Sequence, residues 1–148
     1  MNAMIAALYA ALTLAISPIA YGSVQMRLSE VMVLLAFYNR KFIPGLTLGC
    51  LVANLASPLG AWDLVFGTLA TLLATLSFAK LPRLWMCAVA GSVWNGLIVG
   101  LELTLVFTTP FAVNALSVAA GEVVVLFIGC VMFQLAERRD ALRLIKSV

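Results

Sequence analysis

The chain alternates between long apolar runs and short polar breaks, and this alternation is its strongest sequence signal. A helix that crosses the hydrocarbon core of a bilayer needs about 20 apolar residues, with a range of about 17–25. The pattern predicts six transmembrane helices over residues 3–21, 28–42, 44–57, 62–79, 82–107 and 111–135. The second and third runs are short, so we expect neighbouring helices to bury them or the bundle to tilt them.

Prolines mark the predicted helix boundaries, where a missing backbone N–H does least harm. They are Pro44, Pro58, Pro82 and Pro110. The first run lacks the basic start of a signal peptide, so we expect it to be retained. No internal repeat is visible, which gives no support for an inverted-repeat transporter. We therefore expect one all-α domain over residues 1–148, with a basic tail from about residue 137.

Composition supports a membrane location. Of the 148 residues, 64% are hydrophobic and 10% are charged, and the mean hydropathy is +1.13. Soluble domains are about 45–50% apolar and about 25% charged, and a chain this short cannot hide so much apolar surface. The chain has no histidine, and its three cysteines lie far apart within apolar runs. We therefore expect no metal site, redox pair or cofactor.

Basic residues set the predicted orientation, because cytoplasmic loops carry an excess of Lys and Arg. Eight of the nine fall in regions that six spans place on one side: Arg40, Lys41, Lys80, Arg83, Arg138, Arg139, Arg143 and Lys146. We expect this side, with both termini, to be cytoplasmic. Arg27 is the exception and falls on the outer side.

Polar residues within or beside the spans are the candidate binding groups, since an intramembrane ionisable residue indicates function. The six-span arrangement places the acids among them in the outer half of the bundle. One arginine cannot neutralise four acids, so we expect a ligand that is cationic or rich in N–H donors. The predicted ligand-binding residues are Gln25, Arg27, Glu30, Asn54, Asp63, Trp94, Asn95, Glu102 and Glu122.

Asn54, Asn95 and Arg27 could each have a structural role instead of binding a ligand. Asn54 and Asn95 could join packed helices through amide hydrogen bonds. Trp94 is the aromatic residue that we single out as a possible stacking surface for a planar ring; Trp62 and Trp85 are more typical of packing or interfacial anchoring. The Arg27 side chain could place its charged end at the membrane surface and bind no ligand.

Small residues recur at every fourth position of the first span. Such a stripe lets another helix approach closely. We expect a partner helix to dock there, although the stripe could instead face other spans of the same chain. Its members are Ala3, Ala7, Ala11 and Ala15.

A series of motifs runs in order over nearly the whole chain. They are Gln25-Met26-Arg27-Leu28-Ser29-Glu30, Pro44-Gly45-Leu46, Gly49-Cys50, Asn54, Asp63, Phe66-Gly67-Thr68, Thr71, Asn95, Gly100, Glu102 and Glu122. In these motifs the chain resembles the QueT family of substrate-binding S components of energy-coupling factor (ECF) transporters. It departs from that family at Ala36, which follows Leu34-Leu35 where the family often has a proline.

This resemblance implies a six-helix bundle in the bacterial cytoplasmic membrane that captures a queuosine precursor, queuine or 7-aminomethyl-7-deazaguanine, from outside. It implies a transmembrane T component and two ATPases as partners, with the alanine stripe docking the T component. A carboxylate can accept the adjacent N–H donors of a deazaguanine ring in a bidentate way. The amine on the ring would use a second acid, and the ring carbonyl would suit Arg27 or an amide. The sequence does not assign these acids.

Other classes of function stay open at this point. An S component for another vitamin-like solute has the same pattern, and a proton-coupled exporter could use Glu102 or Glu122 as proton carrier. A membrane enzyme with paired carboxylates is less favoured, because no nucleophile–base pair is recognisable. A structural scaffold would leave the one-sided acids unexplained. The chain has no glycine-rich nucleotide loop, so energy would come from partner ATPases.

Overall fold

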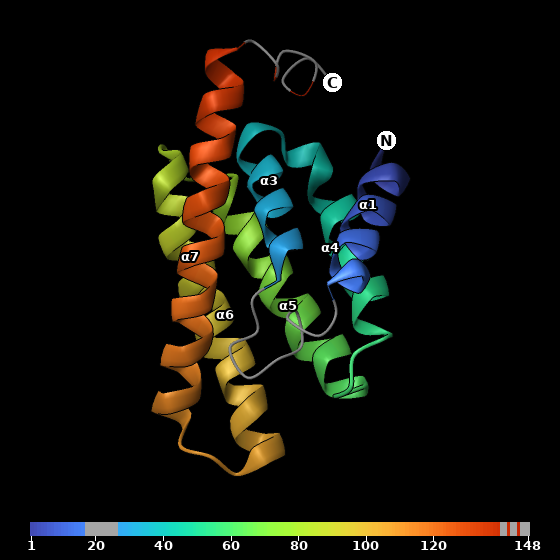
Figure 1. The fold of residues 1–148 in the computed structure, drawn as a ribbon, viewed down its shortest axis with the longest axis vertical. Helices are drawn as coiled ribbons and strands as arrows, with labels where there is room; N and C mark the ends of the chain where they lie inside the picture. The colour runs from blue at the N-terminus through green and yellow to red at the C-terminus, as the bar shows by residue number, and fades with distance from the viewer. Residues whose placement is uncertain (17–26, 140–141, 143–144, 146–148) are drawn as a thin grey trace.

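The computed structural model describes residues 1–16, 27–139, 142 and 145, and this part of the chain is built from helices without strands (Figure 1). The predicted all-α class is confirmed. The elements are α1 (Asn2–Ala15), the 3-10 helix η1 (Leu28–Leu34), α3 (Leu35–Tyr38), the 3-10 helix η2 (Arg40–Phe42), α4 (Ile43–Asn54), α5 (Ala61–Phe78), α6 (Leu84–Phe107) and α7 (Phe111–Arg138).

The helices run alternately along the long axis of the molecule (Figure 1). The N-terminus of α1 and the C-terminal end of α7 lie at the same end, which we call the terminal end. Among the described helices, α5, α6 and α7 are long and apolar enough to cross a membrane, with 18, 24 and 28 residues. The remaining apolar segments are shorter, so the count of six spans stays a prediction.

The second predicted span is not one continuous α-helix. Residues 28–34 form a 3-10 helix, α3 adds four residues, and Asn39 then interrupts the helix with an extended backbone at φ −154° and ψ 115°. The Asn39 side chain accepts a hydrogen bond from the Lys41 backbone N–H and so caps η2. A 3-10 helix rises about 2.0 Å per residue, which lengthens this short segment.

Glycines let two pairs of helices approach closely. A Cβ at Gly49 of α4 would lie 2.7 Å from the Tyr9 Cβ of α1, and a Cβ at Gly100 of α6 would lie 2.7 Å from the Ala115 Cα of α7. Both distances are below ordinary contact. Backbone contact at small residues is the usual means by which membrane helices pack.

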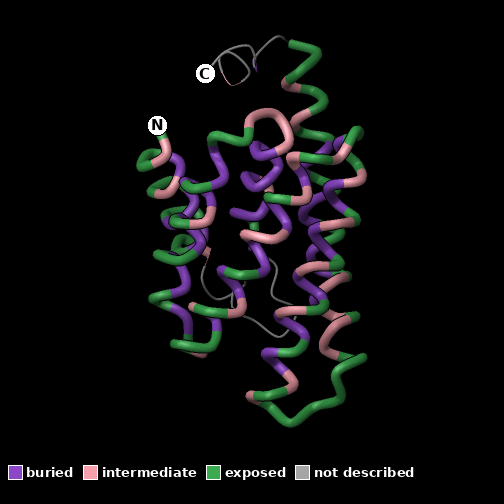
Figure 2. Tube along the Cα trace, turned by 180° about the vertical axis from the view of Figure 1, so that it is seen from behind, coloured by how far each residue is buried: buried purple, intermediate pink, exposed green. Residues whose placement is uncertain are grey.

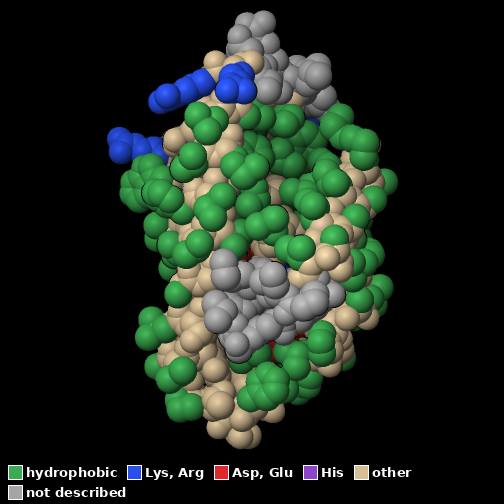
Figure 3. Space-filling view, viewed as in Figure 1, with side chains coloured by type: hydrophobic (Ala, Val, Ile, Leu, Met, Phe, Trp, Pro, Cys, Tyr) green, Lys and Arg blue, Asp and Glu red, His purple; other side chains and the backbone are tan. Residues whose placement is uncertain are grey.

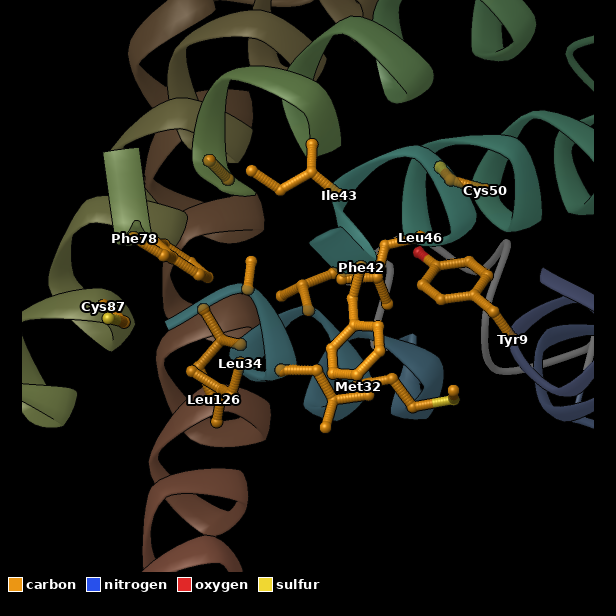
Figure 4. Close-up of a cluster of buried hydrophobic side chains, with 14 of the residues drawn as sticks. Tyr9, Met32, Leu34, Phe42, Ile43, Leu46, Cys50, Phe78, Cys87 and Leu126 are labelled. Atoms are coloured by element: carbon orange, nitrogen blue, oxygen red, sulfur yellow. The ribbon is translucent and has the colours of Figure 1, made fainter. Parts of the chain in front are cut away.

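The main apolar core joins side chains from most of the helices (Figure 4). Its residues come from α1, η1, α3, η2, α4 and α7, from the C-terminal half of α5 and from the N-terminal part of α6. Representative members are Leu34, Phe42, Phe78, Cys87 and Leu126. A second, smaller apolar cluster, formed by Ala70, Val99, Leu103 and Val118, lies between α5, α6 and α7.

The outer surface is apolar. Exposed residues follow the outside of the helices (Figure 2), and hydrophobic side chains cover most of the face in Figure 3, with Lys and Arg gathered at the terminal end. Leu116 and Met4 are 71% and 70% exposed. Lipid is the solvent that such a surface requires.

The alanine stripe lies on this outer surface. All four of its residues are exposed, so they do not pack on the described helices of the same chain: Ala3, Ala7, Ala11 and Ala15. Instead, α1 packs on α4 through its opposite face, where Asn2, Ala6 and Tyr9 meet the α4 glycines.

Candidate ligand-binding site

An ion pair lies at the end of the bundle opposite the terminal end. Arg27 immediately precedes η1, and Asp63 lies in the first turn of α5. The Arg27 Nη2 donates to Asp63 Oδ1 at 3.0 Å, and the two residues are 6% and 0% exposed. The Ser57 hydroxyl donates to the other oxygen, Asp63 Oδ2. Both Asp63 oxygens are therefore engaged within the chain.

Asn54, at the end of α4, ties this helix to α5. Its Nδ2 donates to the Asp63 backbone carbonyl at 2.8 Å and approaches Thr68 Oγ1 at 3.4 Å. Gly67 makes room for this contact, since a Cβ there would lie 2.9 Å from Asn54 Nδ2. The Asn54 side-chain nitrogen thus makes the interhelical hydrogen bond that the sequence offered as a structural role for this residue. Its buried Oδ1 receives no hydrogen bond from the described residues.

Glu30 forms the centre of a second polar group, deeper in the bundle. Its Oε1 accepts hydrogen bonds from the Tyr9 hydroxyl of α1 and from Thr71 Oγ1 of α5, the latter at 3.4 Å. Thr71 also donates to Cys50 Sγ of α4 at 3.2 Å. Glu30 is 2% exposed, and its Oε2 has no hydrogen-bond donor within the described ranges. One of its two oxygens therefore stays available as an acceptor.

Two further buried acids come from α6 and α7. Glu102 is 0% exposed, and neither of its oxygens receives a hydrogen bond from any residue that the structure describes. Its charged neighbours are Asp63 and Arg27. Glu122 is also buried, with Oε1 lacking a donor in the described part of the chain, and its charged neighbours are Glu30 and Arg27.

A buried carboxyl without a hydrogen-bond donor is unfavourable, because it has lost water without gaining a replacement. Four acids on four elements converge on one arginine, and three of them keep open acceptor oxygens. Such an arrangement can accept several N–H donors from a ligand. No three His, Cys, Asp or Glu side chains of the described ranges are placed to hold one metal ion.

The remaining predicted contacts lie elsewhere. Asn95 is buried on α6, seven residues before Glu102 and on the same helical face, and its Nδ2 donates to the Gly91 carbonyl of its own helix at 3.2 Å. Trp94 is half-buried and packs against the apolar core. Gln25 lies outside the described residues. A ligand contact for these three residues stays a prediction.

Two polar residues of the site, Tyr9 and Ser57, were not among the residues predicted from the sequence. Tyr9 is completely buried, and its signal was a single hydroxyl-bearing ring in the middle of an alanine-rich run. Ser57 precedes Pro58 in the connection between α4 and α5, where a serine normally passes for a turn residue. Both became recognisable only once folding had placed them beside an acid.

Together, these features define a class of protein: a helical membrane protein with an apolar exterior and a buried, acid-rich polar site between its helices, as in membrane transport proteins. The family model described as QueT transporter matches residues 1–138. The chain belongs to the QueT transporter family, and its relatives are transporters rather than enzymes.

One curated relative is similar over almost its full length. The protein named queuosine precursor transporter QueT, from Lactococcus lactis subsp. cremoris (strain MG1363), is 34% identical over 166 aligned positions. The alignment covers 95% of this chain and 93% of that protein. No solved structure matches the chain.

Proposed function

We propose that this chain is the membrane-embedded, substrate-binding S component of an ECF-type importer, and that it captures a queuosine precursor from outside the cell. The precursor is queuine or 7-aminomethyl-7-deazaguanine. The chain performs no catalysis. A transmembrane T component and two ATPases supply the energy, and the assembly resides in the bacterial cytoplasmic membrane with both termini of this chain in the cytoplasm.

One observation carries the proposal: buried acids from η1, α5, α6 and α7 converge, and three of them keep acceptor oxygens without a donor among the described residues. A deazaguanine ring has adjacent N–H donors, and its aminomethyl arm is cationic. Charge-assisted hydrogen bonds of this kind are among the stronger contacts available to a small ligand. The name of the Lactococcus relative supports the same class of substrate.

The proposed outer side follows from the distribution of polar groups. Asp63 lies in the first turn of α5 and Glu102 near the last turn of α6, and both of these helix ends point away from the end with the chain's N-terminus and most of its basic side chains (Figures 1 and 3). With the basic end in the cytoplasm, these two acids lie on the outer side of the site. An importer requires its binding subunit to collect the solute from that side.

Ligand binding by the isolated chain tests this function. We expect the purified full chain in lipid nanodiscs to bind 7-aminomethyl-7-deazaguanine or queuine saturably, with one ligand per chain, in isothermal titration calorimetry. Adenine serves as a control, because it lacks the paired N–H edge of a guanine. A folded protein that binds neither precursor would contradict the proposal.

The partner assignment needs a separate test at the alanine stripe. Ala7→Leu together with Ala11→Leu adds bulk to an exposed face, so we expect the variant to lose co-purification with a T component and ATPases while it keeps ligand binding. Ala120→Leu, at an exposed position of α7, is the matched control and should keep both. Unchanged co-purification of the double variant would remove this face from the proposed interface.

A further inference from the structure

We propose that the site has two levels with different tasks: Glu102 accepts the paired N–H donors of the ligand ring, whereas Glu30 and Glu122 together hold the ammonium group of its side arm. This assignment rests on the proposed function and deepens it. It makes Glu30 and Glu122 the residues that determine specificity for a precursor with an amine.

The first step is the separation of the levels along α5. Asp63 marks one level through its pair with Arg27, and Thr71 marks the other through its hydrogen bond to Glu30. Eight residues of an α-helix rise about 12 Å. We call these the Asp63 level and the Glu30 level.

Helices α6 and α7 give an independent measure of the same separation. They run in opposite directions, and Gly100 lies against Ala115. Glu102 is two residues beyond this contact toward the Asp63 level, and Glu122 is seven residues beyond it toward the Glu30 level. At about 1.5 Å per residue, the two acids differ in level by roughly 13 Å.

Glu122 and Glu30 share a level. Helices η1 and α7 run in the same direction (Figure 1), and a Cβ at Gly129 of α7 would lie 2.8 Å from Leu34 Cδ1 of η1. Glu122 precedes Gly129 by seven residues, about 10 Å of α-helix. Glu30 precedes Leu34 by four residues, about 8 Å of 3-10 helix. The two carboxyls thus lie at about the same level on two elements that are in contact.

The open oxygens differ between the levels. At the Asp63 level, Arg27 and Ser57 already donate to Asp63. Neither oxygen of Glu102, which lies beside Asp63, receives a hydrogen bond from the described residues. A carboxylate whose two oxygens lack donors can accept two parallel N–H donors, such as the ring N–H and exocyclic amine of a deazaguanine.

At the Glu30 level, Glu30 Oε2 and Glu122 Oε1 receive no hydrogen bond from the described residues, and they belong to two separate side chains. Two acceptors from separate side chains do not match a planar pair of donors. They do match an ammonium group, which has three donors that point in different directions. The paired acids also supply the negative charge that a buried cation requires.

The size of the ligand fits the separation. A fused bicyclic ring with an aminomethyl arm measures roughly 7–8 Å from donor edge to amine, and two hydrogen bonds of about 2.8–3.0 Å add roughly 6 Å. The sum is close to the distance between the levels. One ligand molecule can therefore reach both.

Two probes that differ only in the arm test this assignment. We would titrate the full chain in nanodiscs with 7-aminomethyl-7-deazaguanine and with 7-cyano-7-deazaguanine, which has the same ring and a neutral arm. We expect Glu122→Gln to weaken binding of the aminomethyl probe by about 10- to 100-fold and to change binding of the cyano probe little. Glu30→Gln is a second variant at the same level with the same expected selectivity.

Glu102→Gln should instead weaken both probes by similar factors, because both carry the same ring. Glu137→Gln, an exposed acid near the end of α7, is the matched control and should change neither. Equal losses for both probes in Glu122→Gln and Glu30→Gln would overturn the two-level assignment but not the proposed function. A loss confined to the aminomethyl probe in Glu102→Gln would do the same. Failure of the wild-type chain to bind either probe or queuine would overturn the proposed function itself.

Discussion

The buried ion pair between Arg27 and Asp63 shows how a charge is tolerated in an apolar bundle. Each Asp63 oxygen has its own donor, and Asn54 fixes the Asp63 backbone. Breaking such a pair leaves an uncompensated charge, which commonly destabilises a protein by about 3–5 kcal/mol, whereas replacing both partners with apolar residues can be nearly neutral.

We therefore expect Arg27→Met to lower the free energy of unfolding by about 3 kcal/mol. The double variant Arg27→Met with Asp63→Leu should recover part of this loss. The measurement is unfolding in detergent for the wild type, both single variants and the double variant. Strictly additive effects would show that the pair contributes no coupling energy.

The Tyr9 hydroxyl donates a hydrogen bond to Glu30 from α1, the helix whose alanine stripe is the proposed docking face. Tyr9→Phe removes this donor and leaves the ring, so we expect affinity for the aminomethyl precursor to fall by about 3- to 10-fold, the effect of one hydrogen bond of about 1 kcal/mol. Calorimetry on the folded variant measures the change.

Tyr38→Phe is the matched control for this variant. The Tyr38 hydroxyl approaches the exposed Glu137 at 3.4 Å, near the basic end of the molecule. We expect wild-type affinity from it. Equal affinities for Tyr9→Phe and the wild type would exclude Tyr9 from the organisation of the site.

At the scale of elements, close helix packing sets the position of the acids. Gly100 lies two residues before Glu102, and a Cβ there would meet the Ala115 backbone at 2.7 Å. Because the nearest atoms belong to the backbone, a side chain cannot be accommodated by a rotamer change. The two helices must separate, and Glu102 moves with α6.

Gly100→Ala should consequently lower the free energy of unfolding by about 1–3 kcal/mol, as overpacking does, and weaken ligand binding in the same variant. Thermal unfolding and calorimetry give the two values. The control is Ala120→Leu, which adds a larger group at an exposed position of α7. Wild-type behaviour of Gly100→Ala would show that the α6–α7 contact can relax without moving the site.

The apolar pattern predicted the long helices well and the short ones less well. Helices α5, α6 and α7 agree with the predicted spans to within three residues at every end, and the end of α6 and the start of α7 coincide with them. The 3-10 helix η1 was not predictable, because α- and 3-10 helices share the same apolar composition and differ only in backbone hydrogen bonding. The structure begins α6 at Leu84 rather than at Pro82.

The candidate site shows the same limits. Ionisable residues stand out in an apolar chain, so Arg27, Glu30, Asp63, Glu102 and Glu122 were all found by type. Their grouping into two levels could not be read from sequence, because it depends on which helices are neighbours and on the direction of each. Hydroxyl partners such as Tyr9 were missed because a tyrosine is common in apolar helices.

At the scale of the whole molecule, the proposed orientation predicts which connections between helices face the outside of the cell. Lys80 and Thr109 are exposed and lie in the connections at opposite ends of α6, and the three native cysteines are buried. We expect Thr109→Cys to react with a membrane-impermeant maleimide on intact cells, and Lys80→Cys to react only after permeabilisation. The reverse labelling pattern would place the acid-rich end in the cytoplasm.

The proposed binding and docking surfaces lie on different parts of the bundle. The acids are buried between helices, whereas the alanine stripe lies on the outer surface of α1. Variants in one region should therefore leave the other functions intact, which makes the proposed binding and docking roles separable by experiment.

The most direct test of the proposed binding site is calorimetric titration of the purified chain in nanodiscs with 7-aminomethyl-7-deazaguanine, for the wild type and for Glu102→Gln. We expect saturable binding of one ligand per wild-type chain, and an affinity about 10- to 100-fold weaker for a folded Glu102→Gln variant. Equal affinities for the two proteins, or no saturable binding by folded wild-type chain, would contradict the proposed site.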